Sequence, residues 1–193
     1  MLILASTSRT RHDLLRNAAI PFEARAPRVD EGAVRDALLA EGHGPRDVAD
    51  ALAEMKALRV RGAGLVMGCD QVLDHDGRCI SKPATPEKAE EQLRALSGGV
   101  HRLHTAAVIA ENGRPVWRHV ETVTMTMRSA SPAFIRDYVA RNWDIIRHSA
   151  GSYTLEGEGA RLFRRVDGDH FSVLGLPLLP LIDFLIERGE VAA

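Results

Sequence analysis

The first seventeen residues place a strand, a hydroxyl-rich loop and the start of a basic helix in direct succession. Residues 2–5 are all apolar and predict a buried strand, and a helix is expected from the loop to about Asn17. The connecting segment is Ser6-Thr7-Ser8-Arg9-Thr10-Arg11. A helix N-terminus carries unpaired backbone N–H groups and a positive dipole end, so hydroxyls and arginines there form a site for an anion, most often phosphate. The alternative is that Ser8 only caps the helix and the arginines are solvated.

The composition is that of an ordinary globular chain. Its 193 residues suit one domain spanning residues 1–193, with 45% hydrophobic and 26% charged residues. The formal net charge of −1 argues against general nucleic-acid binding, although a local basic cleft stays compatible with it. No apolar run approaches the roughly 20 residues that span a bilayer, and no signal-peptide pattern occurs. We therefore expect a cytoplasmic protein without a targeting peptide or a membrane partner.

Two residue types are scarce enough to be informative. Cys69 and Cys79 form no CxxC pair, which predicts free thiols in a reducing compartment. The basic residues are arginines except Lys56, Lys82 and Lys88. Lysine carries a compact charge and arginine a planar fork, so a lysine retained in such a chain indicates a place where the fork does not fit.

The middle of the chain predicts a helix followed by a buried strand. After a loop at residues 28–32, Pro45 begins a helix with an apolar stripe formed by Val48, Leu52 and Met55. Lys56 lies at the edge of this stripe, where its stem would pack and its ammonium would reach outward. The apolar residues 65–69 then end at Asp70-Gln71, a pattern that presents an acid at the edge of a sheet.

The other elements mix strands and helices. Strands are expected at residues 22–26, 78–80, 103–110, 116–127, 162–166 and 172–174, with turns at residues 74–77 and at Asn112-Gly113. Thr85-Pro86 and Ser131-Pro132 begin helices, residues 150–159 form a glycine-rich loop, and a last helix covers residues 177–188. Because strands and helices do not alternate strictly, the pattern predicts an α/β domain with a mixed sheet.

Three groups of residues could carry chemistry. The basic group is Arg9, Arg11, Lys56 and Lys82; the acidic group is Asp30, Glu31 and Asp70; the third is the glycine-rich loop with Glu156. Together they suit a phosphate substrate carried with a divalent metal, since Mg²⁺ takes one or two protein carboxylates plus phosphate oxygens and water. Arginine and lysine would stabilise the phosphate charge. Taken singly, the acids also fit a solvated turn or a strand-end cap, and Lys82 fits an exposed turn.

Other catalytic motifs are absent from the sequence. There is no Walker A loop and no His-Glu-x-x-His pair. His101 and His104 would point to opposite faces of a strand, which makes them a poor metal pair. Ser152 has glycine on one side only and lacks the pattern of a nucleophile elbow.

In its motifs the chain resembles the Maf family of nucleoside triphosphate pyrophosphatases over nearly its full length. The matching segments are LILASTSRTRHDLL at the start, VDE, EMKA, GCDQV, SKP, AGSY and VLGLP, in this order. The resemblance implies an elongated α/β fold similar to inosine triphosphatases, with a mixed sheet flanked by helices and two lobes around a central cleft. It also implies hydrolysis of a nucleoside triphosphate to the monophosphate and diphosphate, helped by Mg, Mn or Co, and it admits a homodimer.

Family roles carry over to matching positions. Asp70 resembles the general base that activates water, and Glu31 resembles a carboxylate that holds the metal together with Asp70. The residues that resemble the family's phosphate-binding set are Ser6, Arg11, Lys56 and Lys82.

The family divides by the base of its substrate. Gln71 and Glu156 resemble the branch acting on 7-methyl-GTP, whereas the dTTP/UTP branch typically has threonine and glutamine there. A carboxylate at Glu156 can also accept from guanine N–H donors. Thr10 departs from the 7-methyl-GTP branch, which typically carries a stacking tryptophan at that position, and Arg9 replaces a proline. The alternatives are a dTTP/UTP pyrophosphatase and, in another class, a nucleotide-binding regulator of septum formation with little catalysis.

Overall fold

A mixed sheet of seven strands organises the computed structural model, which describes residues 1–192. The strand order is β2-β1-β3-β5-β6-β7, and β4 pairs with β3. Strand β1 runs parallel to β2 and β3, whereas β4 and β7 run antiparallel to β3 and β6. The bounds are β1 Leu2–Ala5, β2 Phe22–Ala24, β3 Leu65–His75, β4 Arg78–Ile80, β5 Val100–Glu111, β6 Arg114–Met127 and β7 Phe163–Asp167. The predicted α/β class with a mixed sheet is confirmed.

Helices flank the strands, and the expected caps begin two of them. Thr85 accepts from the backbone N–H of Lys88, and Ser131 accepts from that of Phe134. The proline that follows each cap has no N–H to leave unsatisfied in the first turn. The bounds are α1 Arg9–Asn17, α2 Glu31–Ala40, α3 Pro45–Arg59, α4 Pro86–Leu96, α5 Pro132–Ile146, the 3₁₀ helix η1 Glu158–Leu162, α6 His170–Val173 and α7 Leu178–Glu187.

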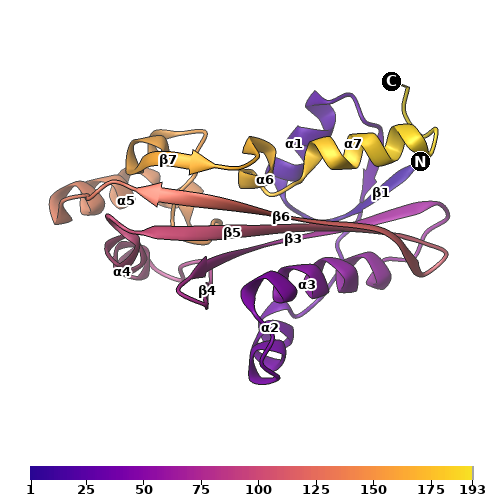
Figure 1. The fold of residues 1–193 in the computed structure, drawn as a ribbon. Helices are drawn as coiled ribbons and strands as arrows, with labels where there is room; N and C mark the ends of the chain where they lie inside the picture. Colours follow the sequence, from indigo (N-terminus) through magenta and orange to yellow (C-terminus); the bar gives the residue numbers. More distant parts are fainter. Residues whose placement is uncertain (193) are drawn as a thin grey trace. The chain divides into compact units, whose positions relative to one another are not determined.

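The chain forms two compact units. The first comprises Met1–Gln71, His104–Thr122 and the chain from Asp169 onward, and the second comprises Val72–Leu103 and Val123–Gly168. Within the first unit, α1 and α7 lie on one side of the strands and α3 lies on the other (Figure 1). Its core joins fully buried side chains from β1, α1, β3 and α7, namely Leu4, Leu15, Met67 and Leu181. Because β1 is covered on both faces, all four of its residues are buried.

Two tight hairpins match their sequence signals. Asn112 and Gly113, between β5 and β6, have φ of 52° and 74°. Asp76 and Gly77, between β3 and β4, have φ of 52° and 78°, and Asp74 Oδ1 accepts from the N–H of Gly77 at 2.7 Å. Two consecutive positive φ values are the signature of the turn whose twist matches that of the flanking strands.

Three predicted elements differ from the structure. Residues 28–32 are not all loop, because Asp30 accepts from the N–H of Ala33 and caps α2, which begins at Glu31. Residues 172–174 do not form a strand, because Asp169 accepts from the N–H and hydroxyl of Ser172 and caps α6. The strand that starts at Leu65 does not end at Asp70 but continues to His75, where β4 pairs with it.

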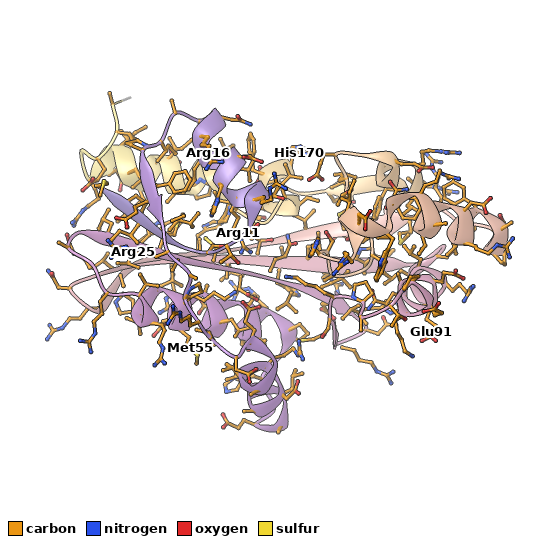
Figure 2. The ribbon with its side chains drawn as sticks, turned by 180° about the vertical axis from the view of Figure 1, so that it is seen from behind. Arg11, Arg16, Arg25, Met55, Glu91 and His170 are labelled. Carbon is orange, nitrogen blue, oxygen red and sulfur yellow. The ribbon has the colours of Figure 1, made fainter. Side chains whose placement is uncertain are left out.

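The buried face of α3 also differs from the predicted stripe. Met55 is 38% exposed and lies on the outer side of α3 (Figure 2), whereas Lys56 is only 4% exposed. The reason is the close approach of α3 to β3: a Cβ atom on Gly68 would lie 2.0 Å from the carbonyl oxygen of Ala53. Small residues line this contact, so Lys56 is turned inward and nearly all of its side chain is buried.

Two simpler expectations can also be compared with the structure. Cys69 is a buried free thiol, as predicted, and Cys79 is partly buried on β4. Among residues 1–192, no helix is both long enough and apolar enough to cross a bilayer.

Candidate active site

The loop between β1 and α1 holds Arg11 by two of its nitrogen atoms. Arg11 Nη1 donates to Ser6 Oγ at 3.2 Å, and Arg11 Nε donates to the carbonyl oxygen of Gly175 at 2.7 Å. Ser6 is buried, and its Oγ also accepts from the N–H of Ser8. Ser8 is the N-cap of α1 and accepts from the N–H of Arg11, as the alternative interpretation expected, but Arg11 is bound by Ser6 and Gly175. The arginine is thus fixed beside a helix N-terminus, the geometry that favours an anion.

A buried ammonium lies between two carboxylates in the same unit. Lys56 Nζ, on α3, is 2.6 Å from Asp70 Oδ1 on β3 and 2.7 Å from Glu31 Oε1 at the start of α2. It also donates to the carbonyl oxygen of Cys69 at 3.4 Å. The side chains of Lys56 and Asp70 are 5% and 8% exposed, while that of Glu31 is 49% exposed. Glu31 therefore closes the solvent side of an otherwise buried pair.

Burial sets the electrostatics of Asp70. The loss of hydration raises the pKa of this carboxyl, while the charge of Lys56, its hydrogen bond and the charge of Arg11 act in the opposite direction. Glu31 adds a like charge that raises the pKa further. A buried carboxyl with a raised pKa and specific charged partners is typical of a functional site. Its carboxylate form is a stronger base than that of a solvated aspartate.

Gln71 uses its amide to hold the backbone of α6. Its Nε2 lies 2.8 Å from Thr105 Oγ1 and donates to the carbonyl oxygens of Ser172 and Val173 at 2.8 and 3.1 Å. Thr105 Oγ1 itself donates to the carbonyl of Ser172 at 2.7 Å. Because the segment after α6 supplies the Gly175 carbonyl that binds Arg11, Gln71 connects the strand of Asp70 to the arginine through this segment.

The remaining predicted residues are more exposed. Thr10 is half-buried in the first turn of α1. Lys82 is exposed in the loop between β4 and α4, and Glu156 is exposed in the turn that precedes η1. The structure brings Ser6, Arg11, Glu31, Lys56 and Asp70 together within the first unit. Lys82 and Glu156 belong to the second unit.

Sequence reasoning did not assign roles to Thr105 and Gly175. Gly175 has φ of 99°, and a Cβ there would lie 3.5 Å from Arg11 Nε. Gly175 falls within the motif VLGLP, so the motif already indicated that this segment matters. Thr105 is a threonine within a strand, a common residue in that setting, and nothing in the local sequence distinguishes it.

The fold and these residues define a mixed α/β protein with an anion site beside a buried carboxylate–ammonium pair. The sequence profile of the Maf-like proteins matches residues 1–188, and the chain belongs to this family.

Curated relatives extend over almost the same length. A protein of Ruegeria pomeroyi named nucleoside triphosphate pyrophosphatase is 57% identical over 98% of this chain and 97% of its own. One of Caulobacter vibrioides with the same name is 48% identical over 97% of this chain and 96% of its own. A protein of Rhizobium meliloti named 7-methyl-GTP pyrophosphatase is 46% identical over 100% of this chain and 98% of its own.

Proposed function

We propose that this protein hydrolyses a nucleoside triphosphate to the nucleoside monophosphate and diphosphate. The observation that carries the proposal is the buried Asp70, held at 2.6 Å by Lys56 and influenced by the charge of Arg11. A base, two cations and a helix N-terminus in one unit match the needs of phosphoryl chemistry, in which positioning and charge stabilisation supply most of the catalysis. The names of the curated relatives support the same reaction.

Asp70 is the general base in this proposal. Its carboxylate takes a proton from a water molecule whose oxygen attacks the α-phosphorus. The bond between the α-phosphorus and the bridging oxygen breaks, and diphosphate leaves with that oxygen. The raised pKa of Asp70 suits this role, because a carboxylate with a higher pKa accepts a proton more readily.

The cationic residues stabilise the charge on the substrate. Arg11 is oriented by Ser6 and Gly175, so its guanidinium is presented in a fixed direction to a phosphate bound at α1. Lys56 shares its charge between Asp70 and the phosphates. Lys82, in the exposed loop before α4, is the remaining member of the phosphate-binding set that the family resemblance implies. Charge that is fixed in advance costs no reorganisation when the transition state forms.

Two carboxylates would hold a divalent metal whose remaining ligands come from the substrate and water. Glu31 and Asp70 converge on one ammonium, and within the described residues no cluster of three or more His, Cys, Asp or Glu could hold a metal by itself. Mg²⁺ commonly uses one or two carboxylates together with phosphate oxygens and water. When bound, Mg, Mn or Co would neutralise phosphate charge and polarise a phosphoryl oxygen.

For the base of the substrate, we propose 7-methyl-GTP or another modified nucleotide. The relative from Rhizobium meliloti carries that name, and the exposed Glu156 can accept from guanine N–H groups. A dTTP/UTP preference is the alternative. Gln71 Nε2 already contacts three acceptors, so it is not available to a nucleotide base. We therefore propose that Gln71 influences the choice of base indirectly, through the position of α6. Cytoplasmic location and a homodimer stay predictions from the sequence.

A nucleotide panel tests the proposal. Purified protein with Mg²⁺ or Mn²⁺ is incubated with 7-methyl-GTP, GTP, dTTP, UTP and ATP, and diphosphate is measured. We expect release from at least one nucleotide, and Asp70→Asn should reduce kcat by at least about 10²-fold, the usual contribution of a general base. Asp76→Asn, in the exposed turn of the same hairpin, is the matched control and should retain activity. Tight nucleotide binding without diphosphate release would favour the non-catalytic regulator instead.

A further inference from the structure

A single glutamine in the second unit joins two of its loops. Gln92, on α4, donates from Nε2 to the carbonyl oxygen of Ser81 at 2.8 Å. Its Oε1 accepts from Ser152 Oγ at 2.7 Å. A carbonyl oxygen can only accept, so the contact with Ser81 fixes which end of the amide carries the nitrogen. Both polar ends of Gln92 are therefore used, one for each loop.

The two loops are those that contain Lys82 and Glu156. Ser81 is the immediate neighbour of Lys82, and the next residue, Pro83, is buried. Lys82 is thus an exposed residue between two fixed points. Ser152 lies four residues before Glu156, at the start of the glycine-rich loop. One amide therefore holds the start of the loop from which Glu156 projects as well as the backbone beside Lys82.

Ser152 needs this hydrogen bond. It is fully buried and has φ of 61°, a left-handed conformation that is uncommon for a residue other than glycine. An unpaired buried hydroxyl would cost free energy, and the bond to Gln92 satisfies it. The residues on either side are also fixed: a Cβ on Gly151 would lie 2.4 Å from Leu73 Cδ1, and Tyr153 Oη is 2.7 Å from His101 Nε2. The start of the loop is thus immobilised, and Glu156 projects from its exposed end.

We propose that Gln92 is a positioning residue for nucleotide hydrolysis. Its single amide holds the Lys82 loop and the Glu156 loop in fixed positions relative to each other. Gln92 acts through these loops and not on the substrate itself. The inference rests on the proposed function, in which Lys82 binds phosphate and Glu156 reads the base. Phosphate binding by Lys82 and base selection by Glu156 then both depend on Gln92, a side chain that lies outside the family motifs.

Three variants separate the two hydrogen bonds. Gln92→Met keeps the shape of the side chain and removes both bonds. Gln92→Glu retains an acceptor for Ser152 but removes the donor to Ser81. Ser152→Ala removes only the bond from Ser152. The matched control is Glu91→Met, one residue earlier on the same helix, where the side chain is 57% exposed and points away from the protein (Figure 2).

The experiment measures kcat and KM for the best nucleotide and for a poorer one of different base. We expect Gln92→Met to lower kcat/KM by about 10- to 100-fold, the range that a misplacement of about 1 Å produces. Glu91→Met should stay within about twofold of the wild type. Gln92→Glu should lower kcat/KM for both nucleotides alike, because only the phosphate side is disturbed. Ser152→Ala should reduce the discrimination between the two nucleotides, because the loop of Glu156 is released.

A double-mutant cycle distinguishes positioning from a general structural role. In a Lys82→Ala background, Gln92→Glu should cost less than threefold, because the residue through which it acts is already gone. An equal cost in both backgrounds would overturn the inference, as would wild-type kinetics of Gln92→Met. If Gln92→Met does not fold, Gln92→Glu and Ser152→Ala decide the question alone. A wild-type protein that releases no diphosphate would instead defeat the proposed function.

Discussion

Lys56 Nζ lies 2.6 Å from Asp70 Oδ1, and both side chains are less than a tenth exposed. Burying two charges costs hydration that their attraction only partly restores, so an apolar pair of the same shape would often be at least as stable. The pair is therefore poorly explained as a device for stability. Its position beside Arg11 and Glu31 favours a role in handling phosphate and, with the substrate, a metal.

Removal of Lys56 should damage both stability and activity. Lys56→Met leaves Asp70 buried without its cation, and we expect a loss of about 3–5 kcal/mol in the free energy of unfolding. Lys56→Met with Asp70→Asn should recover much of that stability while staying inactive, because no buried charge remains. Urea unfolding and diphosphate release measure the two effects. Lys88→Met, at a side chain that is 62% exposed, is the control and should change stability by no more than about 0.5 kcal/mol. Equal stability of the wild type and Lys56→Met would contradict the argument.

Gly68 should tolerate no side chain. In Gly68→Ala the new Cβ would lie 2.0 Å from the carbonyl oxygen of Ala53 and 2.5 Å from the nitrogen of Ala57, both backbone atoms of α3. The helix must shift, carrying Lys56 away from Asp70. We expect a loss of about 2 kcal/mol or more in thermal or urea unfolding, together with a fall in kcat.

A second glycine substitution serves as the control for Gly68. Gly32→Ala lies inside α2, where the nearest atom to the new Cβ is 3.5 Å away. It should be neutral or stabilise by about 0.5–1 kcal/mol, since alanine favours a helix. If Gly68→Ala behaved like Gly32→Ala, the close approach of α3 to β3 would not govern the site.

Arg11 should not be replaceable by lysine. Two nitrogens of its guanidinium bind Ser6 Oγ and the Gly175 carbonyl at once, and an ammonium cannot reproduce this fork. Arg11→Lys keeps the charge, yet we expect kcat/KM for nucleotide hydrolysis to fall by about 10- to 100-fold. Arg16→Lys, farther along the same helix (Figure 2) and 64% exposed, should match the wild type. Full activity of Arg11→Lys would show that charge alone is sufficient.

The stability of the protein should decrease between pH 6.5 and pH 4 because of His101. Burial lowers the pKa of His101 to about 4, and the charge of His75 adds to this effect. The folded protein therefore binds a proton less readily than the unfolded chain, whose histidine has a pKa near 6.5. The contribution of neutral His101 to the free energy of unfolding is fully present above the unfolded pKa. It is lost as the pH falls through this window, by up to about 3 kcal/mol.

His101→Gln provides the comparison for this pH dependence. Urea unfolding at pH 7, 5.5 and 4.5 should show a clearly smaller slope in His101→Gln than in the wild type. The carboxyl of Glu158 titrates lower, because its hydrogen bonds to Arg141 and Asn142 lower its pKa from 4.5 to about 2. Its contribution begins only below about pH 4.5, so it does not affect the three pH values measured. An unchanged slope in His101→Gln would mean that another group controls the pH response.

Local sequence patterns determined much of the fold. The helix starts at Thr85-Pro86 and Ser131-Pro132 and the turn at Asn112-Gly113 were predicted, and a cap at Ser8 was one of two interpretations. Each of these features depends on hydrogen bonds and dihedral angles within a few residues. The errors at Ser172 and Met55 have different causes. The cap that Asp169 forms with Ser172 is local, so the strand prediction at residues 172–174 overlooked a signal present in the sequence. The buried face of α3 is decided by the close approach of its alanines to Gly68 on β3, which local periodicity does not record.

The candidate site divides in the same way. Its residue types and their order follow from the chain alone: the hydroxyls and arginine of the first loop, the acid after a buried strand, and the isolated lysines. Three relationships arise only on folding: Lys56 turns inward between Asp70 and Glu31, Gln71 holds α6, and Gln92 joins two loops. Distances across elements depend on how closely backbones can approach, and here a glycine at position 68 allows the approach that buries the lysine.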